Sequence, residues 1–299
     1  MAAAEVFPNL YRINLRIPRG GFESFLDGWL ITDKKRGQTI LVETGPACAV
    51  PDLLRELAQL KADRIDHLIY THIHLDHAGG AGHFSAAHPE ARILAPEKGR
   101  PHIADPSRLT EASKKSLGTL FETYGAPLPV PPEQLTSGGI DGLTVIDTPG
   151  HSPHHSSYIY ELDGKRILFA GEAAGCFSRT EDGDIFMRPA SPHKFFYDSA
   201  IASLDKLLSL QDIDITCFPH SGFMYDAHER FEAAKRQMTL WHNVISEEHP
   251  AGPDEAVAIL KAKDPELLKL QKLPENTMMR EEHFIRQSAE GFRRWIFKV

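Results

Sequence analysis

Three histidines and an aspartate fall within six consecutive positions of the segment THIHLDHAGG, at His72, His74, Asp76 and His77. Imidazole and carboxylate groups are the usual protein ligands of zinc and similar divalent metals. His72 and His74 are two positions apart, so in extended backbone they point to the same side. The run HLIYT before them is typical of a strand, and AGGAGHFSAAH after them is typical of a helix. The cluster therefore predicts a metal site at a strand-to-helix junction.

Further candidate ligands follow other strand-like segments. His151 stands in TPGHSPHH, Glu172 in LFAGE and His220 in FPHSG. Each stands close to glycine or proline, which permit the tight turns found where strands end. Because each of these residues follows the end of a predicted strand, we expect them to contribute to the same site as the first cluster.

The chain alternates strand signals with helical patterns. Strands are predicted over 25–33, 39–45, 67–72, 91–96, 143–150, 156–164, 165–171 and 214–222. Helices are predicted over 50–61, 78–88, 107–124 and 195–210. Asp163 and Gly164 supply the positive φ angles of a tight hairpin turn. This mixture of hairpins and βα units favours a layered α/β architecture.

The pattern changes after residue 225, where apolar residues recur at helical spacing. They are Phe231, Ala234, Met238, Trp241 and Ile245, followed by Ile285, Ala289, Phe292 and Ile296. We therefore expect a catalytic domain over residues 1–225 and a helical extension over 226–299. The extension is interpreted either as a cap over the site or as a dimerisation surface.

Composition narrows the classes of partner. The 299 residues are 41% hydrophobic and 25% charged with a net charge of −8, which is typical of a globular protein that does not bind nucleic acid. No apolar stretch approaches the roughly 18 residues of a membrane span, and the first residues lack a signal-peptide pattern. Three widely spaced cysteines disfavour a disulfide framework. The expected partner is a small-molecule substrate in the cytoplasm, with a homodimer left open.

Taken together and in this order, THIHLDHAGG, TPGHSPHHSSY, LFAGE and FPHSG resemble the metallo-β-lactamase-fold hydrolase superfamily over residues 8–225. The resemblance implies an α/β protein with an αββα sandwich, here followed by a C-terminal helical cap. It also implies two divalent metal ions, most simply zinc, with manganese or iron as alternatives. His72, His74 and His151 would hold one ion, Asp76, His77 and His220 the other, and Glu172 would bridge them.

The function implied is metal-dependent hydrolysis of a small ester, thioester, lactone or phosphodiester by a bridging hydroxide. Asp76 would be the catalytic residue that orients the hydroxide and passes a proton to the leaving group. Two positions depart from the family, which usually has aspartate at Glu172 and at Glu43. These exchanges leave open a metal-retaining regulatory protein, and an iron-dependent oxidoreductase is a further alternative.

Other residues have weaker assignments. Glu43 and His155 are expected to contact the metal ligands without binding the metal themselves. Cys176 is expected in the core. Candidate substrate-binding residues are Phe22, Phe25, His193, Phe223 and Tyr225.

Overall fold

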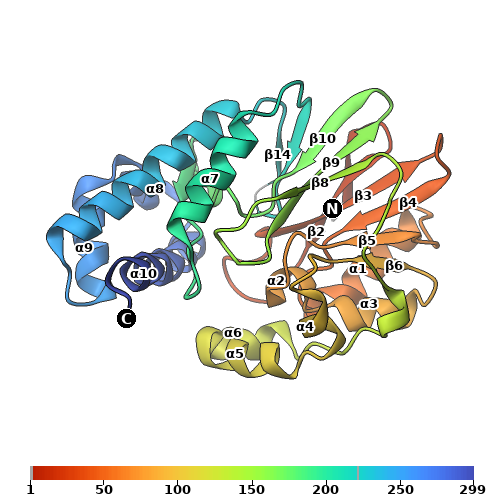
Figure 1. Cartoon of the computed structure of the whole chain (residues 1–299), viewed down its shortest axis with the longest axis horizontal. Helices are drawn as coiled ribbons and strands as arrows, with labels where there is room; N and C mark the ends of the chain where they lie inside the picture. Colours follow the sequence, from red (N-terminus) through yellow and green to blue (C-terminus); the bar gives the residue numbers. More distant parts are fainter. Residues whose placement is uncertain (1–2, 221) are drawn as a thin grey trace.

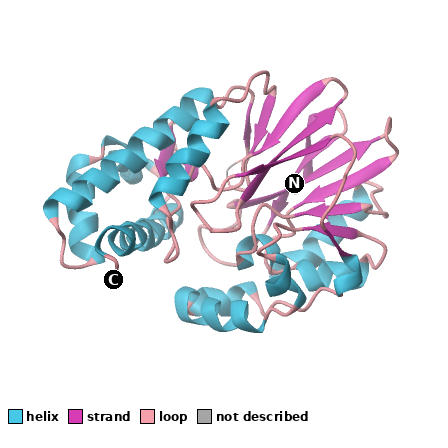
Figure 2. Ribbon diagram, in the orientation of Figure 1, coloured by secondary structure: helices cyan, strands magenta, loops and turns pink. Residues whose placement is uncertain are grey.

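The computed structural model describes residues 3–220 and 222–299 and has two facing β-sheets between layers of helices (Figures 1 and 2). The first sheet has the strand order β1-β2-β3-β4-β5-β6-β7, and the second has the order β14-β13-β10-β9-β8. β11 and β12 form a separate hairpin. Helices α1 to α6 accompany the first sheet, whereas α7 to α10 gather at the other side of the molecule.

The first sheet contains β1 (Ala3–Phe7), β2 (Leu10–Leu15), β3 (Leu26–Asp33), β4 (Gln38–Val42), β5 (His67–Ile69), β6 (Arg92–Leu94) and β7 (Leu135–Thr136). The second contains β8 (Leu143–Asp147), β9 (Ser156–Leu162), β10 (Lys165–Phe169), β13 (Ile215–Cys217) and β14 (Phe223–Met224). The hairpin is formed by β11 (Cys176–Arg179) and β12 (Ile185–Arg188).

The helices are α1 (Val50–Gln59), α2 (Leu75–Ala78), α3 (Ala81–Ala87), α4 (Arg100–Ala104), α5 (Ser107–Leu117), α6 (Thr119–Tyr124), α7 (Tyr197–Leu208), α8 (His228–Glu248), α9 (Pro253–Lys263) and α10 (Glu275–Phe297). Short 3₁₀ helices are η1 (Ala47–Ala49), η2 (Pro132–Gln134) and η3 (Pro265–Lys272). Within the described ranges, no helix combines the length and apolarity that crossing a bilayer would need.

Separate hydrophobic clusters hold the layers together. One packs the first sheet against its helices, with Leu68 of β5 and Leu53 of α1 among its members. A second fills the space between the sheets, where Trp29 and Tyr158 are both buried. Burying each such side chain contributes about 1.5–3 kcal/mol, so these clusters are the main stabilising element of the sandwich. A third cluster, described below, packs helices against the second sheet. The order of layers is therefore αββα, which confirms the expected fold class.

Strand direction explains why distant residues reach one edge. β10 and β13 are parallel, and β8 runs in the same direction because both β8 and β10 are antiparallel to β9. The carboxyl ends of β8, β10 and β13 therefore meet at one edge of the second sheet. His151, Glu172 and His220 follow within a few residues of these strand ends.

Most predicted elements are present, with two helices divided. The helix expected over 78–88 is two short helices, α2 and α3, separated at Gly79 and Gly80. A Cβ atom on Gly80 would lie 2.5 Å from Val50 Cγ2, so the glycine permits a close approach to α1. The helix expected over 107–124 is broken at Gly118, whose φ of 54° lies in the left-handed region. The structure also contains strands that were not predicted: β1, β2, β7, β11, β12 and β14.

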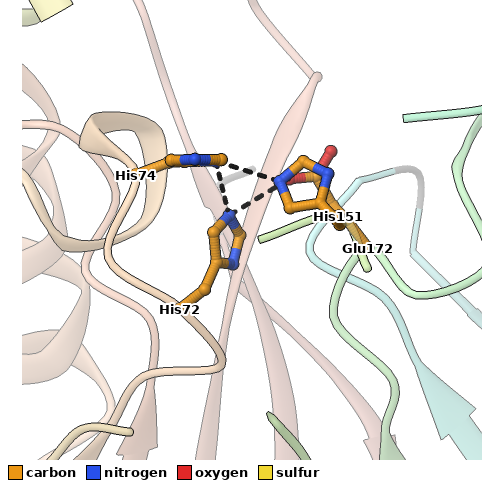
Figure 3. A group of neighbouring side chains, drawn as sticks. All are labelled: His72, His74, His151 and Glu172. Carbon is orange, nitrogen blue, oxygen red and sulfur yellow. Dashed lines mark hydrogen bonds and ion pairs between the residues drawn. The ribbon is translucent and has the colours of Figure 1, made fainter. Parts of the chain in front are cut away.

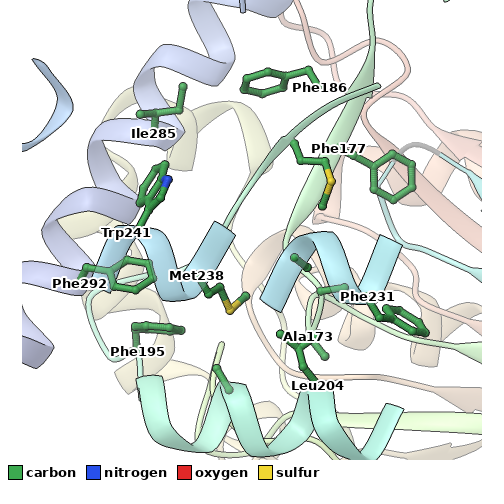
Figure 4. Packing of buried hydrophobic residues seen from close by; sticks show 14 of the residues in the cluster. Ala173, Phe177, Phe186, Phe195, Leu204, Phe231, Met238, Trp241, Ile285 and Phe292 are labelled. Carbon is green, nitrogen blue, oxygen red and sulfur yellow. The ribbon is translucent and has the colours of Figure 1, made fainter. Parts of the chain in front are cut away.

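The C-terminal segment is helical, as its periodicity predicted. Trp241 of α8 and Phe292 of α10 are fully buried, whereas Ile296 at the end of the stripe is only partly buried. These side chains belong to one hydrophobic cluster with Ile159 and Leu168 of the second sheet. Figure 4 shows Trp241 and Phe292 in this cluster. The extension therefore shares a core with the sandwich.

Candidate metal centre

The segment after β5 carries the first group of candidate ligands. β5 ends at Ile69, and His74 is the extended residue that precedes α2. Asp76 and His77 lie in the single turn of α2, which brings them back towards His74, and His77 N donates to His74 O at 3.0 Å. The extended stretch and the short helix thus present the four side chains at one sheet edge, as the motif predicted.

His72, His74 and His151 converge with Glu172 (Figure 3). His74 Nδ1 lies 3.0 Å from His72 Nε2 and 2.9 Å from His151 Nε2. Glu172 Oε2 lies 3.0 Å from His151 Nε2 and 3.3 Å from His72 Nε2. A single cation would satisfy all four atoms at once, whereas pairwise hydrogen bonds among three imidazoles would leave lone pairs facing one another.

Asp76, His77, His220 and the same Glu172 form a second group. Glu172 Oε2 lies 3.2 Å from His77 Nε2, and Glu172 Oε1 lies 3.5 Å from His220 Nε2. His77 Nε2 and His220 Nε2 are buried and have no hydrogen-bond partner among the described residues. Since buried polar atoms normally have partners, these nitrogens fit a second cation. Glu172 is common to both groups.

Backbone carbonyls fix the orientation of two ligand histidines. His151 Nδ1 lies 2.9 Å from Ala190 O, and His220 Nδ1 lies 3.2 Å from Phe25 O. A carbonyl can only accept, so each Nδ1 carries the proton and each Nε2 directs its lone pair into the site. This arrangement is typical of histidines that bind metals.

Glu43 lies near two further candidate ligands, His72 and His77. Its Oε1 accepts from Thr71 N at 2.9 Å and from Thr71 Oγ1 at 2.6 Å. Because the Thr71 hydroxyl donates to Glu43, it accepts from His72 Nδ1, 3.1 Å away. Glu43 Oε2 lies 3.7 Å from His77 Nδ1. The structure thus places Glu43 where its bonds to Thr71 orient His72, while its second oxygen lies near His77 without a hydrogen bond among the described residues.

His155 supports the backbone of Glu172. Its Nε2 accepts from Glu172 N at 3.0 Å, and its Nδ1 lies 2.9 Å from Thr148 Oγ1. Gly171, with φ of 58°, makes room for this ring because a Cβ atom there would lie 2.2 Å from His155 Nε2. The turn that presents Glu172 is therefore held in place by a buried imidazole.

Burial and the nearby carboxylates shift the pKa values of the site histidines in different directions. Burial lowers the pKa of His155 to about 3 and holds the pKa of His74 well below its usual value, so both are neutral. Burial acts in the same direction on His77, but Asp76, Glu172 and Glu43 overcome it and raise the pKa of His77 to about 9. An arriving cation would therefore displace a proton from His77.

The candidate substrate residues separate into two sets. Phe25 is stacked on His220, with ring centroids 4.2 Å apart, and Phe22 packs edge-on against Phe25 at 5.5 Å. Phe223 instead packs against Trp29 in the inter-sheet cluster, and Tyr225 is 64% exposed beside it.

His193 lies elsewhere on the surface. It is exposed, and Arg294 and Glu290 of α10 are the charged groups that act on it. The structure thus brings Phe22 and Phe25 to the site, and it does not bring His193, Phe223 or Tyr225 into contact with the ligand set.

Some residues at the site were not predicted there. Thr71 connects Glu43 to His72, Cys176 contacts Glu172, and Phe284 of α10 stacks on Phe25 at 5.7 Å. Thr71 adjoins the motif and could have been suspected from its position. The contacts of Cys176 and Phe284 arise from tertiary packing, for which the sequence pattern has no signal.

Comparison with known proteins agrees with this geometry. Residues 27–220 match the model of the metallo-beta-lactamase superfamily, and the chain belongs to that superfamily. Among curated proteins, it is 28% identical over 197 residues to a hydroxyacylglutathione hydrolase of Albidiferax ferrireducens, a match covering 64% of this chain and 60% of that protein. It is 29% identical over 203 residues to the hydroxyacylglutathione hydrolase of Alkalilimnicola ehrlichii, covering 67% and 60%. The chain thus spans about 60% of the length of these relatives.

Solved structures share the fold. A metallo-beta-lactamase family protein of Thermus thermophilus superposes with a TM-score of 0.60 at 22% identity, covering 96% of this chain and 93% of that one. A metallo-beta-lactamase superfamily protein of Sulfolobus tokodaii gives 0.59 at 22% identity, covering 77% and 86%. At these identities the likeness shows the fold alone.

Proposed function

We propose that this protein is a metal-dependent hydrolase of a small ester-type substrate, with a thioester as the first candidate. The observation that carries the proposal is the position of Glu172, which lies in both ligand groups and so fits a centre of two metals. Similarity to hydroxyacylglutathione hydrolases favours a thioester among the ester-type substrates. Imidazole and carboxylate ligands favour zinc, with manganese and iron as alternatives.

Two bound divalent ions would lower the pKa of water and supply a nucleophile at neutral pH. The chain itself supplies the shape of the site. The side chain of Asp76 is 22% exposed, whereas those of Glu172 and His220 are 7% and 3% exposed. Substrate would therefore approach from the side of Asp76. The buried side chains of Glu172 and His220 would exclude water from the opposite side of the site.

Asp76 is the proton-handling residue in this proposal. Its Oδ2 lies 3.6 Å from His77 Nε2 and 4.0 Å from His220 Nε2, so it belongs to the second ligand group and also faces solvent. A carboxylate in this position accepts a proton from the attacking water and returns it to the leaving group. Phe25 and Phe22 form the apolar wall next to His220.

The test is a panel of substrates on the zinc-, manganese- and iron-loaded protein. The panel contains a hydroxyacylglutathione, a simpler thioester, a carboxylic ester, a lactone and a phosphodiester. We expect thioester hydrolysis that disappears in Asp76→Ala. A protein that carries two metals and hydrolyses none of these compounds would overturn the proposal and favour the regulatory alternative.

A further inference from the structure

Cys176 is the first residue of β11 and lies against the shared carboxylate. Its Sγ is 3.0 Å from Glu172 Oε1, and its side chain is buried, with 2% of the residue exposed. A carboxylate only accepts hydrogen bonds, so the thiol is the donor. Oε1 also lies 3.5 Å from His220 Nε2. The other carboxylate oxygen, Oε2, is directed at the remaining histidines, with His151 Nε2 at 3.0 Å and His77 Nε2 at 3.2 Å.

The thiol is held in this position by the β11–β12 hairpin. Cys176 pairs with Arg188 across the hairpin. Gly175, with φ of 77°, brings the turn so close that a Cβ atom there would lie 2.4 Å from Arg188 O. Arg188 Nε in turn bonds to Glu281 Oε2 of α10 at 2.5 Å, with both side chains buried. The donor is therefore fixed by contacts that do not involve the metal ligands.

We propose that Cys176 is a positioning residue for Glu172, an inference that rests on the proposed two-metal site. The thiol binds Oε1 and so fixes the rotation of the carboxylate, which leaves Oε2 between the two histidine groups. Aspartate is shorter by one methylene, about 1.5 Å. It could not reach the thiol and the histidines together. Cys176 thus explains how a glutamate occupies a position where the shorter carboxylate is usual.

The experiment measures metal binding, so it does not depend on knowing the substrate. Zinc dissociation constants are determined by competition with a chromogenic chelator, and cobalt-substituted proteins are compared by their visible d–d spectra. The variants are Cys176→Ala and Cys176→Val, which both lack the donor, and Cys176→Ser, which keeps one. Cys217→Ala is the control because that thiol is equally buried, in β13.

We expect Cys176→Ala and Cys176→Val to weaken the weaker zinc site about 10- to 100-fold, with a changed cobalt spectrum. Cys176→Ser and Cys217→Ala should resemble the wild type. In a Glu172→Asp background, Cys176→Ala should have no further effect, because the shortened carboxylate no longer reaches the thiol. Valine fills the space of the thiol, so it answers the question if the alanine variant fails to fold.

Unchanged zinc binding in both donor-free variants would overturn the inference. So would an equal loss in Cys217→Ala, or an intense sulfur-to-cobalt charge-transfer band in the wild type, which would make Cys176 a ligand. A wild-type protein that binds no metal would reject the metal site and this inference together. Conversely, the expected metal-binding pattern in a protein that hydrolyses no ester would retain the inference and reject only the proposed function.

Discussion

The ring of Phe25 lies flat on the imidazole of His220, with centroids 4.2 Å apart and an angle of 28° between the planes. Phe284 of α10, in the C-terminal extension, stacks on the same Phe25 ring, with centroids 5.7 Å apart. His220, a candidate metal ligand, is therefore connected through the stacked ring of Phe25 to Phe284, which lies 64 positions further along the chain.

Phe284→Ala tests this connection. We expect it to cost about 2 kcal/mol of stability, less than a fully buried phenylalanine because Phe284 is only partly buried. We also expect zinc binding to weaken about 10-fold, since His220 loses the support behind Phe25. Met279→Ala is the matched control, as Met279 lies on the same helix and is 61% exposed. Equal zinc affinities for the two variants would show that α10 does not influence the site.

His74→Ala and Asp76→Ala should abolish hydrolysis while the fold is retained. Each removes a candidate ligand from a group whose remaining members are held by other contacts, so thermal unfolding of the metal-free proteins should change little. We expect turnover to fall at least about 100-fold and metal content to fall below that of the wild type. Asp63→Ala, at an exposed aspartate, is the control. Asp76→Ala with near wild-type turnover would refute the role assigned to Asp76.

Glu43 and Glu172 should be energetically coupled because they contact the same imidazole from opposite sides. Glu43 Oε2 lies 3.7 Å from His77 Nδ1, and Glu172 Oε2 lies 3.2 Å from His77 Nε2. We expect Glu43→Asp and Glu172→Asp each to weaken metal binding, with the double variant departing from the sum of the two effects. The measurements are metal stoichiometry and turnover for all four proteins. Strict additivity would reject the coupling, and a more active Glu172→Asp would favour the regulatory alternative.

The ion pair between Arg188 and Glu281 should make stability depend on acid pH. Burial opposes ionisation of Glu281, but Arg188 and Arg280 overcome it and hold its pKa at about 2. The carboxylate therefore stabilises the fold fully above pH 4.5, and this contribution is lost as pH falls towards 2. Glu281→Gln should lose about 3–5 kcal/mol near neutral pH, as expected when one partner of a buried pair is removed.

Urea unfolding of wild type and Glu281→Gln across this pH range checks the sign. The difference between the two proteins should shrink as the solution becomes more acidic. A constant difference from pH 7 to pH 3 would show that Glu281 does not titrate in the way its surroundings indicate. Glu282→Gln, at the neighbouring position, is the control because that side chain is 44% exposed.

Deleting residues 226–299 should prevent folding of the remainder. Trp241 and Phe292 share a hydrophobic cluster with Ile159 and Leu168, so the deletion would expose the outer face of the second sheet. The measurement is expression and circular dichroism of residues 1–225. A stable truncated protein with altered substrate preference would support the cap interpretation, and one with unchanged preference would support the dimerisation alternative.

The sequence predicted the parts of the protein that depend on local pattern. The HxHxDH spacing places four side chains at one strand end, and the apolar periodicity of α8 and α10 identifies their buried faces. The αββα sandwich was expected from the family resemblance that the motifs carry. Short strands such as β7 were missed because two residues carry no periodicity. The contact of Cys176 with Glu172 depends on the hairpin that places them together. His193, a weak candidate, is exposed on a loop beside α10.

The origin of the ligands in two different sheets has a mechanical consequence. His72, His74 and His77 follow β5 of the first sheet, whereas His151, Glu172 and His220 follow strands of the second. Each ion would therefore act as a cross-link between the two halves of the sandwich. Because the complete ligand set exists only in the folded protein, the binding energy of each ion would be added to the stability of the fold. The residues proposed to act in catalysis would then also hold the two sheets together.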